Sequence, residues 1–384
     1  MHIAVICIFA FTASFWLIYG LGTAYGATRL PWLKNFCAAK NEDCAKISLI
    51  FAARDEEEKL PGALETLMQL DYPNLEIIAV DDRSEDGTAN ILDDFAARHD
   101  RLKVIHVSNL PPDWLGKSHA LQQGYEAANG EWLLFTDADV RFRADTLRRS
   151  IALVNELRLD HLTLFGDVEM SGFWETILLT FFAMAFNLAT QPHRVSNPNS
   201  RAYVGVGAFQ MVRRKAYEGA GTHRRLAMEV VDDVKLGKIV KQAGFRSGVA
   251  IAQDAVSVRW HAGARKLVRG VEKNFFAGAQ YNLLLVGVQV FSLLLFHVLP
   301  VFGLLLGHGW VRGLAAISVL VPLCFHIGVD VVMRVSPLYC VTYPLAAVMF
   351  AYMLLRSTVI TLRQRGIIWR GTFYSLERLK RGSV

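Results

Sequence analysis

Charged residues are scarce in this chain, and two long segments contain none. Of its 384 residues, 20% are Asp, Glu, Lys or Arg and 53% are hydrophobic, which gives a mean hydropathy of +0.27. No acid or base precedes Arg29, and none lies between Lys273 and Arg312. The chain is therefore too apolar for intrinsic disorder or for an ordinary soluble enzyme. We expect part of it to lie in lipid.

Cysteine is also sparse, and the sequence lacks the full patterns of a zinc site, a disulfide framework and a P-loop. No pair among the five scattered cysteines has the spacing of a structural zinc site, and the odd number gives no support to a disulfide framework. Collagen and small disulfide scaffolds are excluded. Gly116-Lys117-Ser118 lacks the preceding glycine of a phosphate-cradling P-loop. The net charge of +6 is mild, so its placement matters more than its size.

The uncharged segments predict four membrane-spanning helices. The run Ile3–Ala27 is long enough to cross a hydrocarbon core of ~30 Å, and a cleaved signal peptide is the alternative. Three more spans are expected at about 283–306, 313–333 and 338–361. The predicted organisation is a transmembrane helix at 1–28, a water-soluble, charged domain at 29–282, transmembrane helices at 283–362 and a basic tail at 363–384.

Basic residues after the first span predict its orientation. Arg29, Lys34 and Lys40 indicate that the charged domain at 29–282 lies on the cytoplasmic side of the inner membrane. Four spans would return the tail to the opposite side, whereas its many basic residues favour the inside, and this conflict stays open. Thr176–His193 is also uncharged. A spanning helix there would separate the acidic motifs on either side of it, so interfacial helices are predicted at about 173–190 and 262–282.

The middle of the chain alternates between strand and helix patterns. Apolar strands are predicted at 46–53, 75–80, 102–107 and 131–136, with helical patterns between them. This alternation predicts an α/β fold with a mostly parallel sheet, whose ligands bind at the carboxyl ends of the strands. Asp55, Asp82 and Asp137 each lie just past one of these strands.

Asp137-Ala138-Asp139 places two carboxylates one residue apart at a strand end. Two such oxygen ligands can hold Mg²⁺ or Mn²⁺ and leave positions for phosphate and water. A solvated turn is the alternative reading of this pattern.

Three further groups have both a structural and a functional reading. The cluster Asp81–Thr88 either forms a turn and helix cap or binds a nucleobase or ribose. Lys117, near a helix start, can contact a diphosphate. Asp232 and Asp233 precede a basic amphipathic helix, so they either decorate its N-terminus or supply a general base.

Taken together and in order, these motifs resemble the inverting family 2 glycosyltransferases of the GT-A fold. The membrane layout resembles the lipid glycosyltransferases among them, including the hopanoid-associated and ceramide-glucosyltransferase-like groups. The matching segments are Ala53–Glu56, Val80–Asp82 with Asp86–Thr88, Gly116-Lys117, Asp137–Asp139, Gly205–Phe209, Asp232-Asp233 and Arg259-Trp260.

The resemblance implies a nucleotide-sugar donor, with UDP as the expected nucleotide, and a lipid acceptor; no nucleic acid is expected. It implies that Asp233 is the catalytic base beside Asp232, that Arg259 neutralises the leaving group, and that Asp139 binds Mg²⁺ or Mn²⁺. The implied contacts to the nucleotide sugar are Asp55, Glu56, Asp82, Lys117 and Asp137.

The chain departs from the pattern of the processive polymer synthases, because Val256-Ser257-Val258 stands where they carry a Gln before the Arg-Trp pair. A polysaccharide synthase remains one alternative. The others are a non-catalytic membrane scaffold or transporter component, and a nucleotidyltransferase. His261 is either a third metal ligand or a surface or core histidine.

Overall fold

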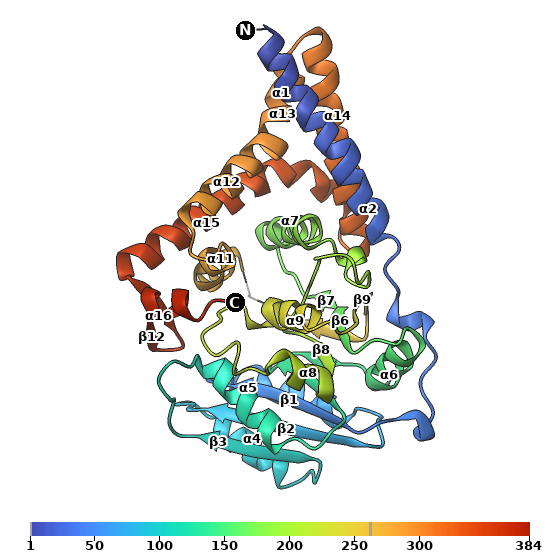
Figure 1. Ribbon diagram of the computed structural model, residues 1–384, viewed down its shortest axis with the longest axis vertical. Coiled ribbons are helices and arrows are strands. Elements are labelled where there is room, and N and C mark those ends of the chain that lie inside the picture. The colour runs from blue at the N-terminus through green and yellow to red at the C-terminus, as the bar shows by residue number, and fades with distance from the viewer. Residues whose placement is uncertain (1, 261–262) are drawn as a thin grey trace. The chain divides into compact units, whose positions relative to one another are not determined.

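The computed structural model describes residues 2–260 and 263–384, which fall into two compact units (Figure 1). One, the helical unit, comprises Met1–Arg29, Met170–His193 and Trp260–Leu376. The other, the sheet unit, comprises Leu30–Glu169, Arg194–Arg259 and Glu377–Val384. Each unit is therefore assembled from segments that lie far apart in the sequence.

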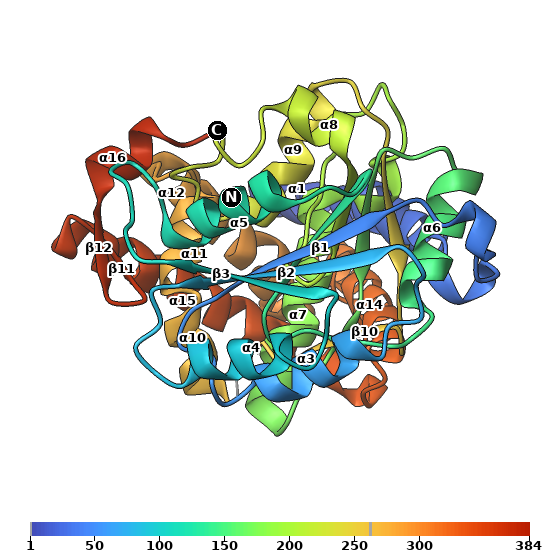
Figure 2. The same cartoon turned by 90° about the horizontal axis from the view of Figure 1, so that it is seen from below.

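A seven-stranded sheet in the order β3-β2-β1-β4-β8-β6-β9 forms the centre of the sheet unit, and Figure 2 shows β1, β2 and β3 side by side. The four predicted strands are confirmed as β1 (Ile47–Ala53), β2 (Leu75–Asp82), β3 (Leu102–Val107) and β4 (Trp132–Asp137), all parallel. The remaining strands are β6 (His161–Phe165), β8 (Gln210–Arg213) and β9 (Ser247–Ile251). Because β8 runs antiparallel to both β4 and β6, the sheet is mixed but mostly parallel.

Helices connect these strands as the alternating pattern predicts. The helices of the sheet unit are α3 (Leu60–Met68), α4 (Thr88–Ala96), α5 (Gly116–Ala127), α6 (Thr146–Glu156), α8 (Arg214–Ala220) and α9 (Asp232–Gln242), with short 3₁₀ turns at Leu33–Asn35 and Asn41–Asp43. On α3, Leu60, Leu64 and Leu67 are buried, as expected from apolar residues spaced three and four positions apart. A second small sheet has the order β5-β10-β7, from Arg141–Phe142, Val256–Val258 and Asp167–Val168.

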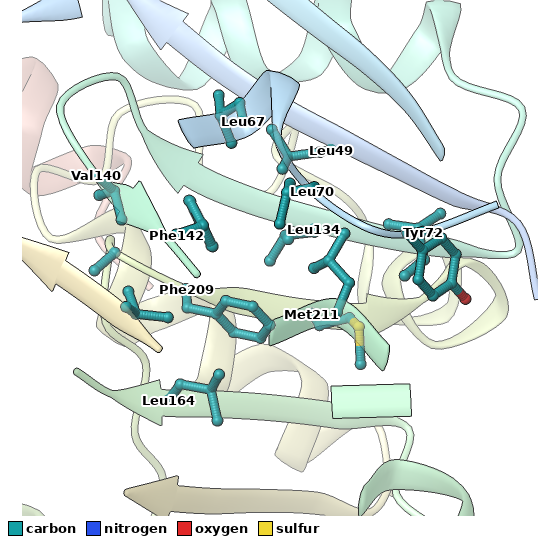
Figure 3. Packing of buried hydrophobic residues seen from close by; sticks show 14 of the residues in the cluster. Leu49, Leu67, Leu70, Tyr72, Leu134, Val140, Phe142, Leu164, Phe209 and Met211 are labelled. Carbon is teal, nitrogen blue, oxygen red and sulfur yellow. The ribbon is translucent and has the colours of Figure 1, made fainter. Parts of the chain in front are cut away.

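Both faces of the large sheet are buried. In β1, Leu49 and Phe51 belong to one apolar cluster, whereas Ile50 belongs to a second cluster on the opposite face. Figure 3 shows the first cluster, in which side chains of β1, β4 and β8 such as Leu49, Leu134 and Met211 meet. Burial of both faces explains why these strands are continuous apolar runs without alternation.

The helical unit consists of long apolar helices and shorter connecting elements. Its first segment contains α1 (His2–Phe15), a π-helical turn (Trp16–Gly20) and α2 (Leu21–Ala27). Its later helices are α7 (Phe173–Thr190), α10 (Ala264–Gly270), α11 (Glu272–Gly278), α12 (Leu283–Leu293), α13 (Leu299–Leu306), α14 (Gly309–Val332) and α15 (Tyr343–Gln364). Shorter pieces are the turns Pro192–Arg194, Leu294–Val298 and Pro337–Thr342 and the hairpin β11–β12 (Gly366–Trp369 and Thr372–Ser375). The last helix, α16 (Leu376–Arg381), lies in the sheet unit except for its first residue.

Five segments of the described chain are long and apolar enough to cross a membrane. They are Ile3–Ala27, Phe173–Arg194, Leu283–Leu306, Gly309–Val332 and Pro337–Gln364. The four predicted spans are thus confirmed as long apolar helices. Many of their large apolar side chains point outward, among them Ile18, Leu284 and Trp310. Contiguous exposed apolar surface of this kind is typical of protein that faces lipid.

The fifth segment contains α7, which the sequence predicts as an interfacial helix. It packs against α14 and α15, and the rings of Phe181 and Phe350 lie 5.0 Å apart. The residues Met170–His193 and Trp260–Leu376 accordingly belong to the helical unit rather than to a continuous 29–282 domain. Nothing in its length or composition distinguishes α7 from a spanning helix.

Candidate functional site

A group of charged side chains gathers at the carboxyl end of β4. The Nζ atom of Lys117 lies 2.7 Å from Oδ1 of Asp137 and 3.7 Å from Oδ1 of Asp232. Asp137 ends β4, Lys117 opens α5, and Asp232 opens α9 together with Asp233. Three predicted site segments that lie far apart along the chain therefore converge.

The carboxylate of Asp233 is held by backbone groups. Its Oδ1 accepts a hydrogen bond from the N–H of Val234 at 2.8 Å, and its Oδ2 accepts one from the N–H of Gly207 at 3.0 Å. Burial raises the pKa of Asp233 above its usual range, and the nearby Asp137 carboxylate also raises this pKa. The Lys117 ammonium and the two backbone N–H groups lower the pKa without cancelling the shift. Asp233 therefore has the properties of a general base.

Lys117 is a permanent positive charge in this group. Burial lowers its pKa, but the carboxylates of Asp137, Asp232 and Asp233 outweigh burial, so the pKa of Lys117 is raised above its usual range. The side chain is thus charged at neutral pH. A partly buried cation at the carboxyl end of a strand can bind an anionic group such as a diphosphate.

Two glycines allow the carboxylates to approach the loop before β8. A Cβ atom on Gly207 would lie 2.5 Å from Oδ2 of Asp137, and one on Gly205 would lie 2.0 Å from the carbonyl oxygen of Asp233. Such distances are sterically forbidden, so side chains at these positions would displace both acids. This requirement explains the Gly205-Val206-Gly207 sequence.

Asp139 and Arg259 meet through a lysine that sequence reasoning missed. The Nζ atom of Lys59 lies 2.6 Å from Oδ2 of Asp139 and 3.2 Å from the carbonyl oxygen of Arg259. The Arg259 side chain is exposed. Lys59 follows a polar cluster at the end of β1, and only the tertiary structure places it beside Asp139.

Asp82 lies against the start of α5. Its carboxylate is buried, pairs with Arg83 Nε at 2.8 Å and lies 3.9 Å from Arg54 Nη1. A Cβ atom on Gly116 would lie 2.1 Å from Asp82 Oδ2. Asp82 is therefore next to the Gly116-Lys117 segment, as expected if both contact one nucleotide.

Asp55 and Glu56 connect the loops that follow β1 and β2. Oδ1 of Asp55 accepts a hydrogen bond from the N–H of Glu85 at 2.8 Å, and the N–H of Glu56 donates to Oγ1 of Thr88 at 2.8 Å. Asp55 has a left-handed backbone with φ of 51°. These contacts give both residues a structural role in shaping the loops, and their nucleotide contacts stay a prediction.

A divalent cation at the Asp137 and Asp139 carboxylates would need further ligands from a substrate or water. Among the described residues, no group of three or more His, Cys, Asp or Glu side chains is placed to hold a metal ion. His261 lies outside the described residues. Mg²⁺ and related ions are commonly held by one or two carboxylates together with substrate phosphates and water. Asp139 and Asp137 offer two carboxylates of this kind, and here each is paired with a lysine: Asp139 with Lys59 at 2.6 Å and Asp137 with Lys117 at 2.7 Å.

A buried polar network beneath Asp233 was also missed. The Nε2 atom of Gln210 donates to the carbonyl oxygen of Asp233 at 3.0 Å, and Oε1 of Gln210 lies 3.1 Å from Nε2 of His161. Burial lowers the pKa of His161 to about 4, so its ring is neutral at pH 7 and can donate to Gln210. The sequence signal that pointed to this network was Gln210, a polar residue in an apolar strand.

Comparisons with known proteins show similarity to glycosyltransferases. Residues 48–220 match the family model described as glycosyl transferase family 2. A 4,4'-diaponeurosporenoate glycosyltransferase of Staphylococcus haemolyticus is 26% identical over 62% of this chain and 64% of that protein. A beta-monoglucosyldiacylglycerol synthase of Trichormus variabilis is 28% identical over 46% of this chain and 37% of that protein. The chain thus spans less than two thirds of the length of these two relatives.

One solved structure has a similar fold over most of the chain. The mannosyltransferase PcManGT from Pyrobaculum calidifontis, in complex with GDP-Man and Mn²⁺, has a TM-score of 0.51 and 16% identity. The match covers 94% of this chain and 95% of that structure. At this identity the likeness shows the fold alone, which confirms the predicted GT-A architecture.

Proposed function

We propose that the chain transfers a sugar from a nucleotide-sugar donor to a membrane lipid, with inversion at the anomeric carbon, because residues 48–220 match the model of glycosyl transferase family 2. The observation that carries this proposal is the placement of Asp233, a carboxylate of raised pKa fixed by two backbone N–H groups beside Lys117 and Asp137. A base, a cation and a second acid in one group are the components of such a displacement.

In the proposed reaction, Asp233 takes the proton of an acceptor hydroxyl. The acceptor oxygen attacks the anomeric carbon from the face opposite the diphosphate, the bond from that carbon to the diphosphate oxygen breaks, and a nucleoside diphosphate leaves. One displacement of this kind inverts the anomeric configuration. Lys117 compensates charge on the departing diphosphate, and Arg259 is proposed to assist it.

Asp139, with Asp137 beside it, would hold Mg²⁺ or Mn²⁺, which stabilises the negative charge of a diphosphate leaving group when bound. The Pyrobaculum mannosyltransferase is in complex with both GDP-Man and Mn²⁺, which supports a divalent cation and a nucleotide-sugar donor for this chain. UDP is the nucleotide we propose, with Asp82 and the loop of Asp55 and Glu56 on the nucleoside side.

The lipid acceptor is supported by two independent observations. The names of the relatives include a carotenoid acid and a diacylglycerol lipid as the molecules that are glycosylated. The helical unit also exposes extensive apolar surface on helices long enough to cross a membrane. We propose an integral membrane enzyme with its sheet unit on the cytoplasmic side, as Arg29, Lys34 and Lys40 indicate.

The test is transfer of label from nucleotide sugars to lipid. The purified chain, reconstituted in vesicles, is incubated with a panel of labelled nucleotide sugars and a membrane lipid extract. Label is expected in the organic phase, and Asp233→Asn is expected to lower kcat by ~10²–10⁴-fold because it removes the base. Asp94→Asn, an exposed acid on α4, is the matched control and should retain full activity.

Four results would contradict the proposal. Label found only in water-soluble polymer would indicate a polysaccharide synthase, and release of inorganic diphosphate would indicate a nucleotidyltransferase. Unchanged function of the Asp233→Asn variant would indicate a non-catalytic scaffold. Retention of the donor's anomeric configuration, measured by NMR on the product, would exclude the single displacement.

A further inference from the structure

A second polar site lies within the helical unit, at the start of α7. Residues 171–175 and 263–266 line a pocket with a volume of about 360 Å³. This volume is within the range of small-molecule sites, roughly 300–1,000 Å³. None of its lining residues belongs to the group around Asp233, so the function proposed above does not explain it.

Glu175 is the unusual residue of this pocket. Its side chain is only 1% exposed, and its Oε2 atom accepts hydrogen bonds from the N–H of Gly263 at 3.0 Å and from Oγ of Ser171 at 3.4 Å. Its Oε1 atom is buried and, among the described residues, has no hydrogen-bond partner. A buried carboxylate oxygen is costly unless a donor reaches it. Glu175 also lines the pocket, so a ligand donor that enters beside it would satisfy this oxygen.

The rim of the pocket has a different character. Phe173 and Trp174 are each 51% exposed and their ring centroids lie 5.4 Å apart, edge to face. Arg265 and Lys266, at the start of α10, are exposed on the other side of the pocket. Exposed aromatic rings beside basic residues on an apolar helical unit are typical of the headgroup level of a membrane.

We propose that this pocket binds the headgroup of a phospholipid whose phosphate is accompanied by a hydrogen-bond donor. The donor, an ammonium or a hydroxyl, reaches Oε1 of Glu175 at the base of the pocket. The phosphate lies between Arg265 and Lys266, and the glyceride and first methylenes lie against Phe173 and Trp174. In such a headgroup the donor lies at the outer end and the phosphate lies next to it. This order matches Glu175 at the base of the pocket and Arg265 and Lys266 nearer its opening.

Lipid binding to the purified full-length chain tests this assignment without any nucleotide sugar, so its result is independent of the proposed transferase activity. Native mass spectrometry would compare dioleoyl phosphatidylethanolamine, phosphatidylglycerol and phosphatidylcholine at equal concentration. The first offers an ammonium donor, the second hydroxyl donors, and the third has a phosphate but no donor. We expect the ethanolamine or glycerol lipid to bind roughly tenfold more tightly than the choline lipid, the effect of one charge-assisted hydrogen bond.

Two variants separate the two parts of the pocket. Glu175→Gln can keep the bond from Gly263 through its amide oxygen but turns a donor toward the cavity, so it should abolish the preference over phosphatidylcholine. Arg265→Gln combined with Lys266→Gln should weaken all three phospholipids and leave the preference intact. The matched controls are Glu156→Gln and Lys215→Gln, both exposed residues of the sheet unit, and they should bind as the unmodified chain does.

Equal binding of the three lipids by the unmodified chain would overturn the proposal and indicate that water satisfies Glu175. A folded Glu175→Gln variant, judged by its thermal unfolding, that keeps the preference would also overturn it. If that variant does not fold, the lipid ranking of the unmodified chain and the response of the Arg265/Lys266 variant decide the question. Preference for the ethanolamine lipid alone would identify an ammonium donor, and preference for the glycerol lipid alone a hydroxyl.

Discussion

Asp233 combines two constraints that determine its chemistry. Its backbone hydrogen bonds fix the orientation of the carboxylate, while its burial and the proximity of Asp137 make its ionised form less favourable. A fixed carboxylate of raised pKa is a stronger base than a solvated one and is already aligned for proton transfer. In the proposed reaction, the pKa of this residue sets the pH range in which the site works.

The first prediction concerns this pH range. Asp233 must be ionised to accept a proton, so kcat should fall as the pH is lowered through its raised pKa, at a pH above the usual value for aspartate of 3.8. Asp137→Asn removes a carboxylate that raises this pKa, so the acidic limb of the residual activity should move to lower pH. Profiles of kcat against pH measure both effects. A limb that stays in place in the variant would show that another group titrates.

The second prediction concerns the divalent cation. Activity should be lost in the presence of EDTA and restored by Mg²⁺ or Mn²⁺, because a cation next to Asp139 compensates the charge of the leaving group. Asp139→Asn should require a higher metal concentration for half-maximal activity, whereas Asp94→Asn should not. Full activity in EDTA would contradict this prediction and leave Lys117 and Arg259 as the compensating charges.

At the scale of elements, α9 is the helix whose first two residues are Asp232 and Asp233, the acids that we propose for catalysis. On its other side, the buried Lys235 lies 3.4 Å from the buried Glu229. The backbone carbonyl of Val384 accepts hydrogen bonds from Lys235 and, at 3.0 Å, from Lys238, and its N–H donates to Glu229 at 2.9 Å. These contacts fix the first turn of α9 and with it the position of Asp232 and Asp233.

The third prediction concerns this buried ion pair. Lys235→Met should lower the free energy of unfolding by about 3–5 kcal/mol, because it leaves the Glu229 carboxylate buried without its cation. Lys238→Met is the matched control; its side chain is partly exposed, and the expected loss is about 1 kcal/mol or less. Denaturant unfolding of the sheet unit, followed by tryptophan fluorescence, measures the difference. Equal losses of unfolding free energy in the two variants would show that the buried ion pair stabilises the protein no more than the contacts of Lys238 do.

At the scale of the whole molecule, the two units have different surfaces. The sheet unit buries both faces of its sheet between helices, whereas the helical unit leaves large apolar side chains exposed on its long helices. Lipid or detergent must cover this exposed apolar surface to keep the protein from aggregating.

The fourth prediction follows from this exposed surface. The chain should stay in the membrane pellet after extraction with alkaline carbonate and should be released only by detergent. The control is a peripheral protein in the same preparation, which carbonate should release. Recovery of the intact chain in the carbonate supernatant would contradict integral membrane insertion.

The sequence by itself determined the elements whose signal is local. Uninterrupted apolar runs defined the long helices, and strands ending at acidic residues defined the first half of the sheet and the edge where Asp82 and Asp137 lie. Periodicity and charge placement are properties of neighbouring residues, so they can be read without knowing the fold. The family resemblance added Asp232 and Asp233, whose local pattern alone is that of a helix N-terminus.

The tertiary structure alone decided which distant residues meet. Four features depend on segments that are remote in sequence. They are the antiparallel position of β8 in the sheet, the ion pair of Lys59 with Asp139, the hydrogen bond from Gln210 to Asp233, and the unpartnered oxygen of Glu175 among the described residues. The raised pKa of Asp233 likewise depends on burial and on Asp137, which no local pattern specifies. Such contacts arise from packing of the complete chain, because the energy of a buried polar group is set by its spatial neighbours rather than by its neighbours in sequence.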